Sequence, residues 1–463
     1  MAVLDAPRVR ERTARPARAL SADSPWLIVA CGGLVLAGAA LLFRIGADAQ
    51  WLAALGRLIA RRHAIPHGVP FALAATGHWP NPIVLAELIF AGFQSALGDS
   101  GLMVLQLTAV TAALVLVARD ARGSGAANLG TGAALTLAGL AALPSLAIAR
   151  GQLFSLVLFP ALALLLRSEA RRPSGRIWLT VPMLALWSNL HGAALLGLGL
   201  LAAYLVFARA RRTPRTAAAV GIAGALALLA TPAGLHTVSY YHGVLTNVAA
   251  QRGEGMWGPL TLASPLDVVL AVCAGWLLWG TWRARAAWWE LAVAAVLAVL
   301  TVQAARNGVW LVMFCAVPAA RTLAPRRALP LLAPVAGLLA VLALGVAVVR
   351  GPLPIGAGPA LVADAVASAH GSPVLGDGVI DEQIALAGGR IWAGNPIDAF
   401  PRSVQATYLD WVDGRRSGAA AVGPAVRVVL VTRGGAAQTL MARMPGFTAV
   451  RADARAVLYE RTG

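Results

Sequence analysis

Residues 25–43, PWLIVACGGLVLAGAALLF, hold no charged residue and follow a basic N-terminus. Their length matches the ~20 apolar residues that an α-helix needs to cross the hydrocarbon core of a membrane. Similar apolar runs recur along the chain, and arginines stand between them. The sequence therefore predicts a polytopic α-helical membrane protein with about eleven transmembrane helices.

The composition of the whole chain agrees with this prediction. Of the 463 residues, 59% are hydrophobic and only 13% are charged, against ~25% charged in an average soluble domain. The mean hydropathy is +0.72. The formal net charge is +18, yet lysine is absent and the arginines form short clusters between apolar runs. Such clusters are typical of cytoplasmic loops that meet anionic lipid, so we expect membrane lipids as partners and no nucleic acid.

Arginine placement predicts the topology. Residues 1–24 are a basic, cytoplasmic N-terminus, and with no clear cleavage site after it we expect an uncleaved anchor. Residues 25–350 are the transmembrane domain. A single assignment of the loops to the two sides of the membrane then places every arginine cluster on the cytoplasmic side. These clusters are at residues 119–122, 167–176, 209–215, 283–285 and 321–327. After the first span, the others are expected at residues 101–118, 129–149, 152–166, 177–190, 192–208, 217–231, 265–282, 287–304, 308–320 and 329–349.

The same topology leaves residues 44–100 as a large first outer loop. Residues 48–62 have helical periodicity, and residues 84–97 are apolar but short, so we expect both to be helices lying at the membrane interface. The alternative is that residues 84–97 span the membrane. That would invert every later segment and place the arginines of 167–176 outside, which the positive-inside rule disfavours.

The C-terminal residues 351–463 differ in composition, with glycine, proline and aspartate turns and β-type runs at 426–432 and 456–459. These features predict a small extracytoplasmic α/β domain, long enough for its own core. Calcium ligation by Asp377, Asp381, Glu382 and Asp398 fits no known loop spacing, so turn or capping roles are expected. No metal or cofactor is predicted.

The predicted topology also gathers polar residues at the outer end of the bundle. Polar groups are costly at membrane depth and are usually kept where they line a cavity or bind a ligand. The alternative for any single arginine is that it snorkels to headgroups. We expect the set as a whole to form a site comprising Asp48, Glu87, Arg150, Gln152, Asn189, His191, Glu254, Trp257, Arg306 and Asn307.

Several of these side chains suit an anionic ligand. Arg150 and Arg306 supply forked donors for a phosphate, and Asn189 and His191 add hydrogen bonds beside it. The chain lacks a P-loop, a GxSxG, an HExxH and a DxD in the first loop. The three cysteines, Cys31, Cys273 and Cys315, each fall in an apolar run without metal or disulfide spacing.

Asp48 is the first carboxylate after the first span, and we expect it to act as a general base for an acceptor hydroxyl. The equally weighted alternative is that Asp48 caps the helix that starts there. Glu87 is the second candidate acid. Trp79, Trp187 and Trp257 are expected to anchor at the interface, the alternative being that they stack on sugar rings.

The order of these pieces resembles the GT-C superfamily of membrane glycosyltransferases, related to protein mannosyltransferases and lipid-A aminoarabinose transferases, in a subgroup of mostly unassigned function. The resemblance covers most of the chain. It rests on Asp48, Trp51, Ile65-Pro66, Trp79, Leu85-Ala-Glu87, Arg150-Gly-Gln152-Leu-Phe-Ser155, Trp187-Ser-Asn189-Leu-His191-Gly192, Thr231-Pro-Ala-Gly234, Glu254, Trp257, Arg306-Asn307, Gly376-Asp377, Asn395-Pro-Ile-Asp398-Ala-Phe-Pro401 and Val457-Leu-Tyr-Glu-Arg461.

The resemblance implies transfer of a sugar from a polyprenyl-phosphate-linked donor to an envelope acceptor at the outer face. An acid of the first outer loop would be the base, and the anomeric carbon would invert. The sequence departs from the family pattern in that Gln50-Trp51-Leu52 lacks a histidine and residues 81–84 lack an acid and an aromatic. These departures predict either an inactive member or one that uses Glu87.

Two further interpretations remain open at the level of the sequence. A transporter or flippase of a lipid-linked substrate would usually have inverted repeats and helices broken at the midplane, and neither is found. A non-catalytic envelope scaffold would agree with the altered first loop. The interpretations differ in whether a polar cavity connects Asp48 with Arg150, His191 and Arg306.

Overall fold

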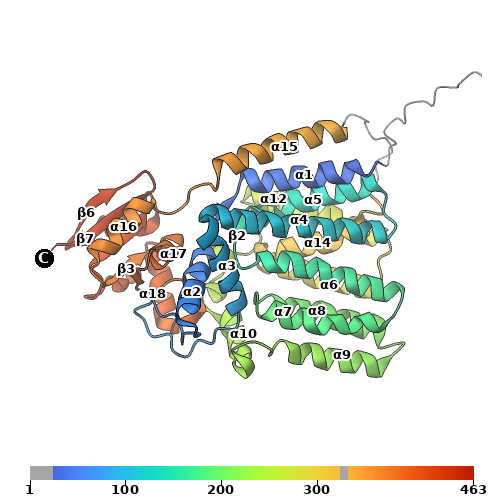
Figure 1. Cartoon of the computed structure of the whole chain (residues 1–463), viewed down its shortest axis with the longest axis horizontal. Helices are drawn as coiled ribbons and strands as arrows, with labels where there is room; N and C mark the ends of the chain where they lie inside the picture. Colours follow the sequence, from blue (N-terminus) through green and yellow to red (C-terminus); the bar gives the residue numbers. More distant parts are fainter. Residues whose placement is uncertain (1–23, 324–331, 463) are drawn as a thin grey trace, which may run out of the picture.

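The computed structural model describes residues 24–323 and 332–462. Figure 1 shows a bundle of long helices and, at one end of it, a smaller domain that contains a β-sheet. The apolar runs of the sequence form the bundle. The predicted class, a mainly helical protein with several apolar helices, is therefore confirmed.

The bundle helices follow the expected spans within a few residues. In the described ranges, α4, α5, α6, α12 and α15 are each long and apolar enough to cross a membrane, and the exact number of spans remains a prediction. The π-helix η2 (Leu205–Arg209) extends α8, and the 3₁₀ turn η1 (Gly175–Leu179) precedes α7. The bundle comprises α1 (Trp26–Leu41), α4 (Asp99–Gly123), α5 (Asn128–Leu146), α6 (Leu153–Arg171), α7 (Thr180–Ser188), α8 (Ala194–Tyr204), α9 (Pro214–Ala227), α12 (Pro265–Arg283), α13 (Trp288–Gln303), α14 (Gly308–Ala319) and α15 (Leu332–Arg350).

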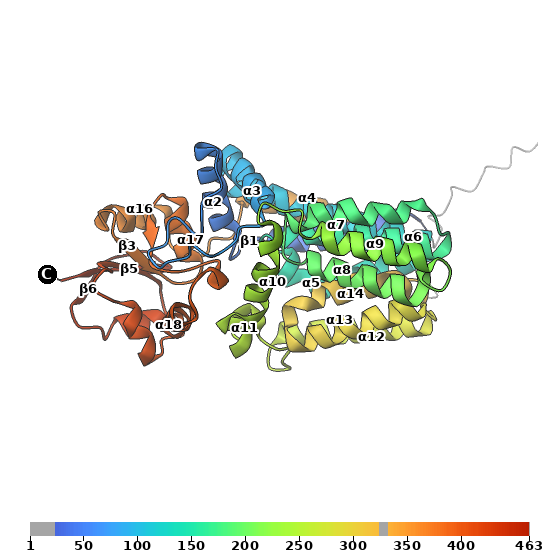
Figure 2. The ribbon, with the colours of Figure 1, turned by 90° about the horizontal axis from the view of Figure 1, so that it is seen from below.

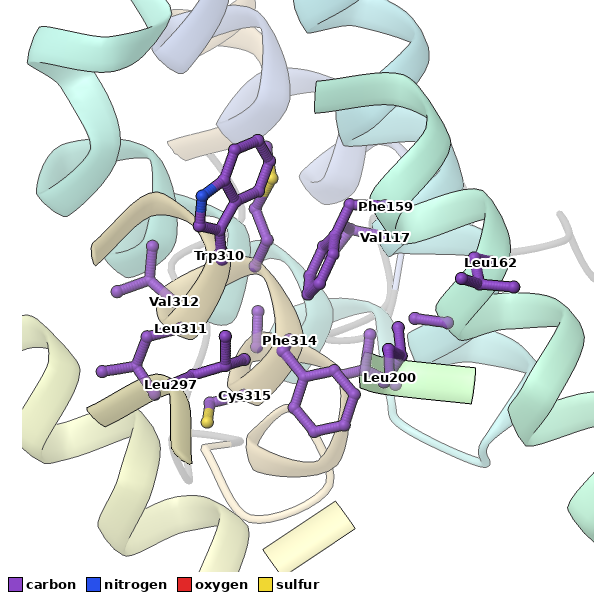
Figure 3. Close-up of a cluster of buried hydrophobic side chains, with 14 of the residues drawn as sticks. Val117, Phe159, Leu162, Leu200, Leu297, Trp310, Leu311, Val312, Phe314 and Cys315 are labelled. Atoms are coloured by element: carbon purple, nitrogen blue, oxygen red, sulfur yellow. The ribbon is translucent and has the colours of Figure 1, made fainter. Parts of the chain in front are cut away.

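Helix α14 is the centre of the bundle, because every one of its residues is buried. Figure 3 shows its Trp310 and Phe314 beside Phe159 of α6. The ring centroids of Phe159 and Trp310 are 5.4 Å apart, within the range favoured by aromatic pairs. This packing fixes the two loops that precede α6 and α14, and both loops carry candidate site residues.

Buried ion pairs join the helices at the end of the bundle away from the sheet. Arg167 of α6 pairs with Asp120 of α4 at 2.8 Å and with Glu290 of α13 at 2.7 Å. Arg209 pairs with Glu169 at 3.0 Å and also donates to the carbonyl oxygen of Ser174. Arg167 and Arg209, from two of the arginine clusters, therefore lie at the end of the bundle opposite the polar set, as the predicted topology requires.

Helices α2 (Ala49–Arg62) and α3 (Val84–Leu97) have the boundaries expected from the sequence. They lie across the end of the bundle nearest the sheet and are not among its parallel helices (Figure 1), which favours the interfacial interpretation of residues 84–97. Gly56 lets the two helices approach closely, because a Cβ there would lie 2.0 Å from the carbonyl oxygen of Glu87.

Several short elements cover the same end of the bundle, among them α10 (Thr237–Thr246) and α11 (Val248–Arg252) (Figure 2). Strand β1 (Arg44–Ile45) pairs in parallel with β2 (Ile148–Ala149). The remaining elements here are η3 (Gly234–His236), η4 (Gly255–Trp257) and η5 (Ala305–Asn307).

The C-terminal residues form a sheet of order β4-β3-β5-β7-β6 within the described ranges. Strand β3 is parallel to β4 and β5, and β7 is antiparallel to β5 and β6. The two β-type runs of the sequence lie in β5 and β7. The elements are α16 (Pro359–Ser368), β3 (Pro373–Gly376), α17 (Val379–Leu386), β4 (Arg390–Ile391), η6 (Ile397–Ala399), α18 (Arg402–Val412), η7 (Arg416–Ala421), β5 (Val428–Thr432), α19 (Ala436–Met441), β6 (Phe447–Ala452) and β7 (Ala456–Arg461).

The first loop docks on the free edge of this sheet. The N–H of Leu73 donates to the carbonyl oxygen of Ile391 at 2.8 Å, and the N–H of Ile391 donates to the carbonyl oxygen of Phe71 at 2.9 Å. A segment of the first loop therefore pairs alongside β4, in parallel, at the edge of the sheet. The C-terminal domain and the end of the bundle share one continuous interface.

Candidate functional site

The two-stranded sheet β1–β2 brings Asp48 beside Arg150. Because the strands are parallel, their carboxyl ends emerge at the same edge, and these two residues follow shortly after them. Gly46 permits this close pairing, since a Cβ there would lie 2.1 Å from the side chain of Ile148. Asp48 and Arg150, which are 102 residues apart in sequence, then form an ion pair of 3.0 Å.

This ion pair is sheltered but not sealed. The side chain of Arg150 is 16% exposed and that of Asp48 is 26% exposed, so the carboxylate remains open to a ligand. The Nε of Arg150 also donates to the carbonyl oxygen of Ala47 at 3.3 Å. The guanidinium is thus held by two groups of the same loop, and its position relative to Asp48 is fixed.

Asp48 occupies the N-cap position of α2, as the alternative interpretation proposed, but its carboxylate makes no capping bond within the described residues. The cap comes from Glu382 of α17, whose carboxylate accepts from the N–H groups of Asp48 at 2.7 Å and Gln50 at 3.2 Å. Asp48 has a positive φ of 83°, a conformation that is uncommon for a residue other than glycine. Its side chain is therefore free to face Arg150.

Glu87 is fully buried on α3 and is held by Asn81, whose Nδ2 donates to both carboxyl oxygens at 2.9 Å. Burial raises the pKa of Glu87 to about 8, although the hydrogen bond from Asn81 opposes the shift. Glu87 is accordingly protonated at neutral pH. A protonated carboxyl cannot accept a proton, so the structure disfavours Glu87 as the base.

His191 lies in the loop between α7 and α8 with its tautomer fixed by its neighbours. Trp187 donates to the hydroxyl oxygen of Ser155 at 2.7 Å, and that hydroxyl lies 2.8 Å from Nδ1 of His191. Because Nδ1 also accepts from the N–H of Ala193 at 3.3 Å, the remaining proton is on Nε2. Burial lowers the pKa of His191 to about 3, with Asp48 opposing the shift and Arg150 and Arg306 adding to it. His191 is a neutral donor.

Arg306 in η5 stacks on Trp257, with its guanidinium carbon 3.8 Å from the ring centroid. Burial, followed by repulsion from Arg150, lowers the pKa of Arg306 to about 10, so it stays charged at neutral pH. Two mutually repelling cations with one neighbouring carboxylate leave net positive charge at this place. Such a site favours an anion with several oxygen acceptors, such as a phosphate.

An aromatic cluster borders these charges, and one of its members, Tyr240, was not among the predicted residues. Trp79 lies edge-on to Trp51 at 6.2 Å and to Tyr240 at 6.5 Å. The indole N–H of Trp79 donates to Asp398 of the C-terminal domain at 2.9 Å. Trp79 is 7% exposed, so it is a packed and hydrogen-bonded residue, which corrects the expectation that it anchors at the interface.

Trp187 also differs from its expected role. It is completely buried, and its indole N–H is used by Ser155. Neither interfacial anchoring nor stacking on a sugar is open to it. The sequence showed that Trp187, Ser155 and His191 are present. It could not show that Trp187 is buried, because its burial depends on how α6, α7 and α8 pack together.

Three further members of the predicted set, Asn189, Asn307 and Glu254, have other partners. The amide of Asn189 donates to the carbonyl oxygens of Ala185 and Ala230, and that of Asn307 donates to Leu300, so both amides hold the backbone. Gln152 holds the N-cap position of α6, and its side chain makes no capping bond within the described residues. Glu254 pairs with Arg415 at 2.6 Å and belongs to an exposed ionic cluster with the C-terminal domain. The site thus centres on Asp48, Arg150, His191 and Arg306.

Two surface hollows of about 400 and 430 Å³ lie elsewhere, the first between α2 and residues 385–390 and the second between α2 and α3. Both are lined by Arg57 and Arg61 and neither contains a residue of the site just described. Within residues 24–323 and 332–462, no group of three or more histidine, cysteine or acidic side chains has an arrangement that would hold a metal ion. The three cysteines, all in described segments, are unpaired.

No protein-family model matches the chain, and no curated protein sequence matches it. Its fold, however, is similar to that of ArnT from Cupriavidus metallidurans, a GT-C glycosyltransferase. The apo structure of that protein has a TM-score of 0.53 and 13% identity, covering 94% of this chain and 97% of that chain. The structure of ArnT bound to undecaprenyl phosphate has a TM-score of 0.52 with the same identity and coverage. The resemblance to the GT-C superfamily is therefore confirmed at the level of the fold.

Proposed function

We propose that this ArnT-like protein is a membrane glycosyltransferase, which transfers a sugar from a polyprenyl-phosphate-linked donor to an envelope acceptor at the outer face. The observation that carries the proposal is the ion pair of Asp48 and Arg150 at 3.0 Å, beside neutral His191 and charged Arg306. A carboxylate next to an anion site is what transfer from a phosphate donor needs. ArnT was crystallised with undecaprenyl phosphate, a ligand of this chemical class.

In the proposed reaction, an acceptor hydroxyl attacks the anomeric carbon of the donor sugar from the face opposite the phosphate. The new bond from the acceptor oxygen to carbon forms as the bond from carbon to the phosphate oxygen breaks, so the configuration inverts. Asp48 takes the proton of the acceptor hydroxyl. The leaving phosphate keeps the electron pair, and Arg150, Arg306 and the Nε2–H of His191 stabilise its developing charge.

The position of these groups favours transfer over the transporter alternative. A transporter usually binds its substrate near the bilayer midplane between broken helices. Here the charged groups are in the loops that follow β1 and β2 and that precede α14, at one end of the bundle. The scaffold alternative leaves the shared position of Asp48, Arg150, His191 and Arg306 without a purpose.

The test uses purified protein in lipid nanodiscs with a panel of polyprenyl-phosphate sugars and an envelope lipid extract. Release of polyprenyl phosphate is followed by mass spectrometry. Asp48→Asn should lower the rate about 100-fold or more, because general base catalysis typically contributes that much, while undecaprenyl phosphate still binds. Full activity of Asp48→Asn would remove Asp48 from the scheme, and absence of turnover by the wild type on every donor would favour the scaffold.

A further inference from the structure

Helix α17 of the C-terminal domain delivers a buried carboxylate to the start of α2. Glu382 is 1% exposed. One of its oxygens accepts from the N–H of Asp48 at 2.7 Å and from the Nδ2 of Asn395 at 2.8 Å. The other oxygen accepts from the N–H groups of Gln50 at 3.2 Å and Trp51 at 3.4 Å. Four donors therefore converge on one side chain.

These bonds satisfy the orphan donors of the first turn of α2. The first N–H groups of a helix have no partner inside the helix, and a buried turn without partners is strongly disfavoured. A carboxylate also suits the positive end of the helix dipole. Asp48 is in the position where its own side chain would usually do this, yet Glu382 does it instead.

We propose that Glu382 is a positioning residue, which holds the backbone of Asp48 so that its carboxylate faces Arg150 and the reacting acceptor. The inference rests on the proposed function, and it makes the C-terminal domain a part of the site. Asn395, from the loop before η6, keeps the carboxylate of Glu382 in place through its own bond. The backbone of Asp48 has a positive φ of 83°, so a conformation that is costly by itself is held by these external bonds.

Charge around Glu382 gives this role a pH dependence. Burial, followed by the charge of Asp48, raises the pKa of Glu382 to about 7, against the bonds from Asn395 and the N–H groups of Asp48 and Trp51. The charged or titratable neighbours are Asp48, whose partner is Arg150, and Asp381 on the same helix. Protonation of Glu382 would place a hydrogen on one of the two carboxylate oxygens that accept from N–H groups in this structure. Acid should therefore weaken the hydrogen bonds that Glu382 accepts from the N–H groups of Asp48, Gln50 and Trp51, and so lower turnover.

The variants are made in the full-length chain. Glu382→Gln keeps the shape but removes the charge and one acceptor oxygen. The matched control is Asp381→Asn, because Asp381 is equally buried on α17 but bonds inside the C-terminal domain, to the N–H of Gly376 at 2.9 Å and the hydroxyl of Tyr408 at 2.5 Å. The melting temperature of each variant shows how much the substitution lowers the stability of the fold, separately from its effect on turnover.

With a donor that the wild type uses, Glu382→Gln should lower kcat about tenfold or more, because small displacements of a catalytic group are costly. The KM for the donor should change little. Wild-type kcat should fall as pH decreases through about 7, and Glu382→Gln should lose that step. Asp381→Asn should keep both kcat and the step. Equal losses in the two variants, or an unchanged kcat in Glu382→Gln, would overturn the positioning role.

A second readout does not need turnover and so separates this inference from the proposed function. Hydrogen exchange of the amides of residues 48–52 should be faster in Glu382→Gln than in the wild type or Asp381→Asn. Equal exchange in all three proteins would overturn the inference even if transfer were established. Faster exchange in Glu382→Gln together with a wild type inactive on every donor would keep the cap and reject the function.

Discussion

The backbone and the side chain of Asp48 have different partners. Its N–H opens α2 by donating to Glu382, whereas its carboxylate pairs with Arg150. The positive φ lets the two point to different partners. Asp48 therefore holds the N-cap position, but the interpretation that its side chain caps α2 is wrong, because that carboxylate pairs with Arg150.

Arg306 should contribute directly to binding of the anionic ligand. We expect Arg306→Ala to raise the Kd for undecaprenyl phosphate about tenfold or more, since a hydrogen bond to a charged group contributes about 1.5–3 kcal/mol. The control is Arg283→Ala, because Arg283 also stacks on a tryptophan, Trp279, at 5.6 Å but lies at the opposite end of the bundle. Native mass spectrometry with the lipid measures both. The same Kd in the two variants would remove Arg306 from the anion site.

Glu87→Gln should distinguish the two candidate acids. Burial raises the pKa of Glu87 to about 8 from 4.5, so the folded protein binds one proton more than the unfolded chain between these values. The stabilising effect of the neutral carboxyl is complete below about pH 4.5 and is lost as pH rises to about 8. Glutamine is always neutral and still offers an oxygen to Asn81. The melting temperature of Glu87→Gln should depend less on pH over this range, and its transfer activity should persist.

These two readouts are measured by thermal unfolding in detergent and by release of polyprenyl phosphate. Loss of activity in Glu87→Gln with an unchanged fold would return Glu87 to the catalytic scheme. An identical pH dependence of melting in the variant and the wild type would show that Glu87 is not the group that titrates.

Helices α2 and α3 should depend on the absence of a side chain at Gly56. In Gly56→Ala, the new Cβ would lie 2.0 Å from the carbonyl oxygen of Glu87, and the helices would have to separate. We expect a loss of about 1–3 kcal/mol in the free energy of unfolding. Gly92→Ala on α3 is the control, because a Cβ there would meet no side chain and no backbone from another element of the described residues within 4 Å. Chemical unfolding that gave both variants the same stability would contradict this close approach.

The elements were largely predictable because their cause is local. Apolar runs bounded by arginine predicted the bundle helices. Residues 48–62 and 84–97 were also predicted to be helices, and these bounds agree with those of α2 and α3 to within one residue. The runs at 426–432 and 456–459 became β5 and β7. The expected span at 329–349 begins outside the described residues. Its described part, from residue 332 onward, lies in α15.

The site was only partly predictable, because its missing members come from distant parts of the chain. Asp48, Arg150, His191 and Arg306 were found by their residue types and by their predicted position on the same side of the membrane. Glu382 was considered only for local turns or caps, and it does cap a helix, but one whose first residues are more than 300 positions earlier. The bond between Trp79 and Asp398 is equally long-range. Only the docking of the C-terminal domain creates these pairs.

The orientation of the whole molecule can be tested by cysteine labelling. The proposed topology places Ala75, exposed in the first loop, outside the cell and Pro173, exposed in the turn after α6, inside. In a chain with Cys31, Cys273 and Cys315 replaced by alanine, Ala75→Cys should react with a membrane-impermeant maleimide in intact cells. Pro173→Cys should react only after permeabilisation. The reverse pattern would invert the topology and place the site on the cytoplasmic side.

The bond from Asp48 to Glu382 joins residues 334 positions apart, so the order of synthesis matters for when the protein becomes competent. While the ribosome is making the bundle, the start of α2 has no carboxylate from α17 to hold it. Residue 382 must be translated, and under the proposed topology moved across the membrane, before the first loop can settle. Chains that stop before residue 382 would therefore lack the cap of α2, and the proposed site would be incomplete in them.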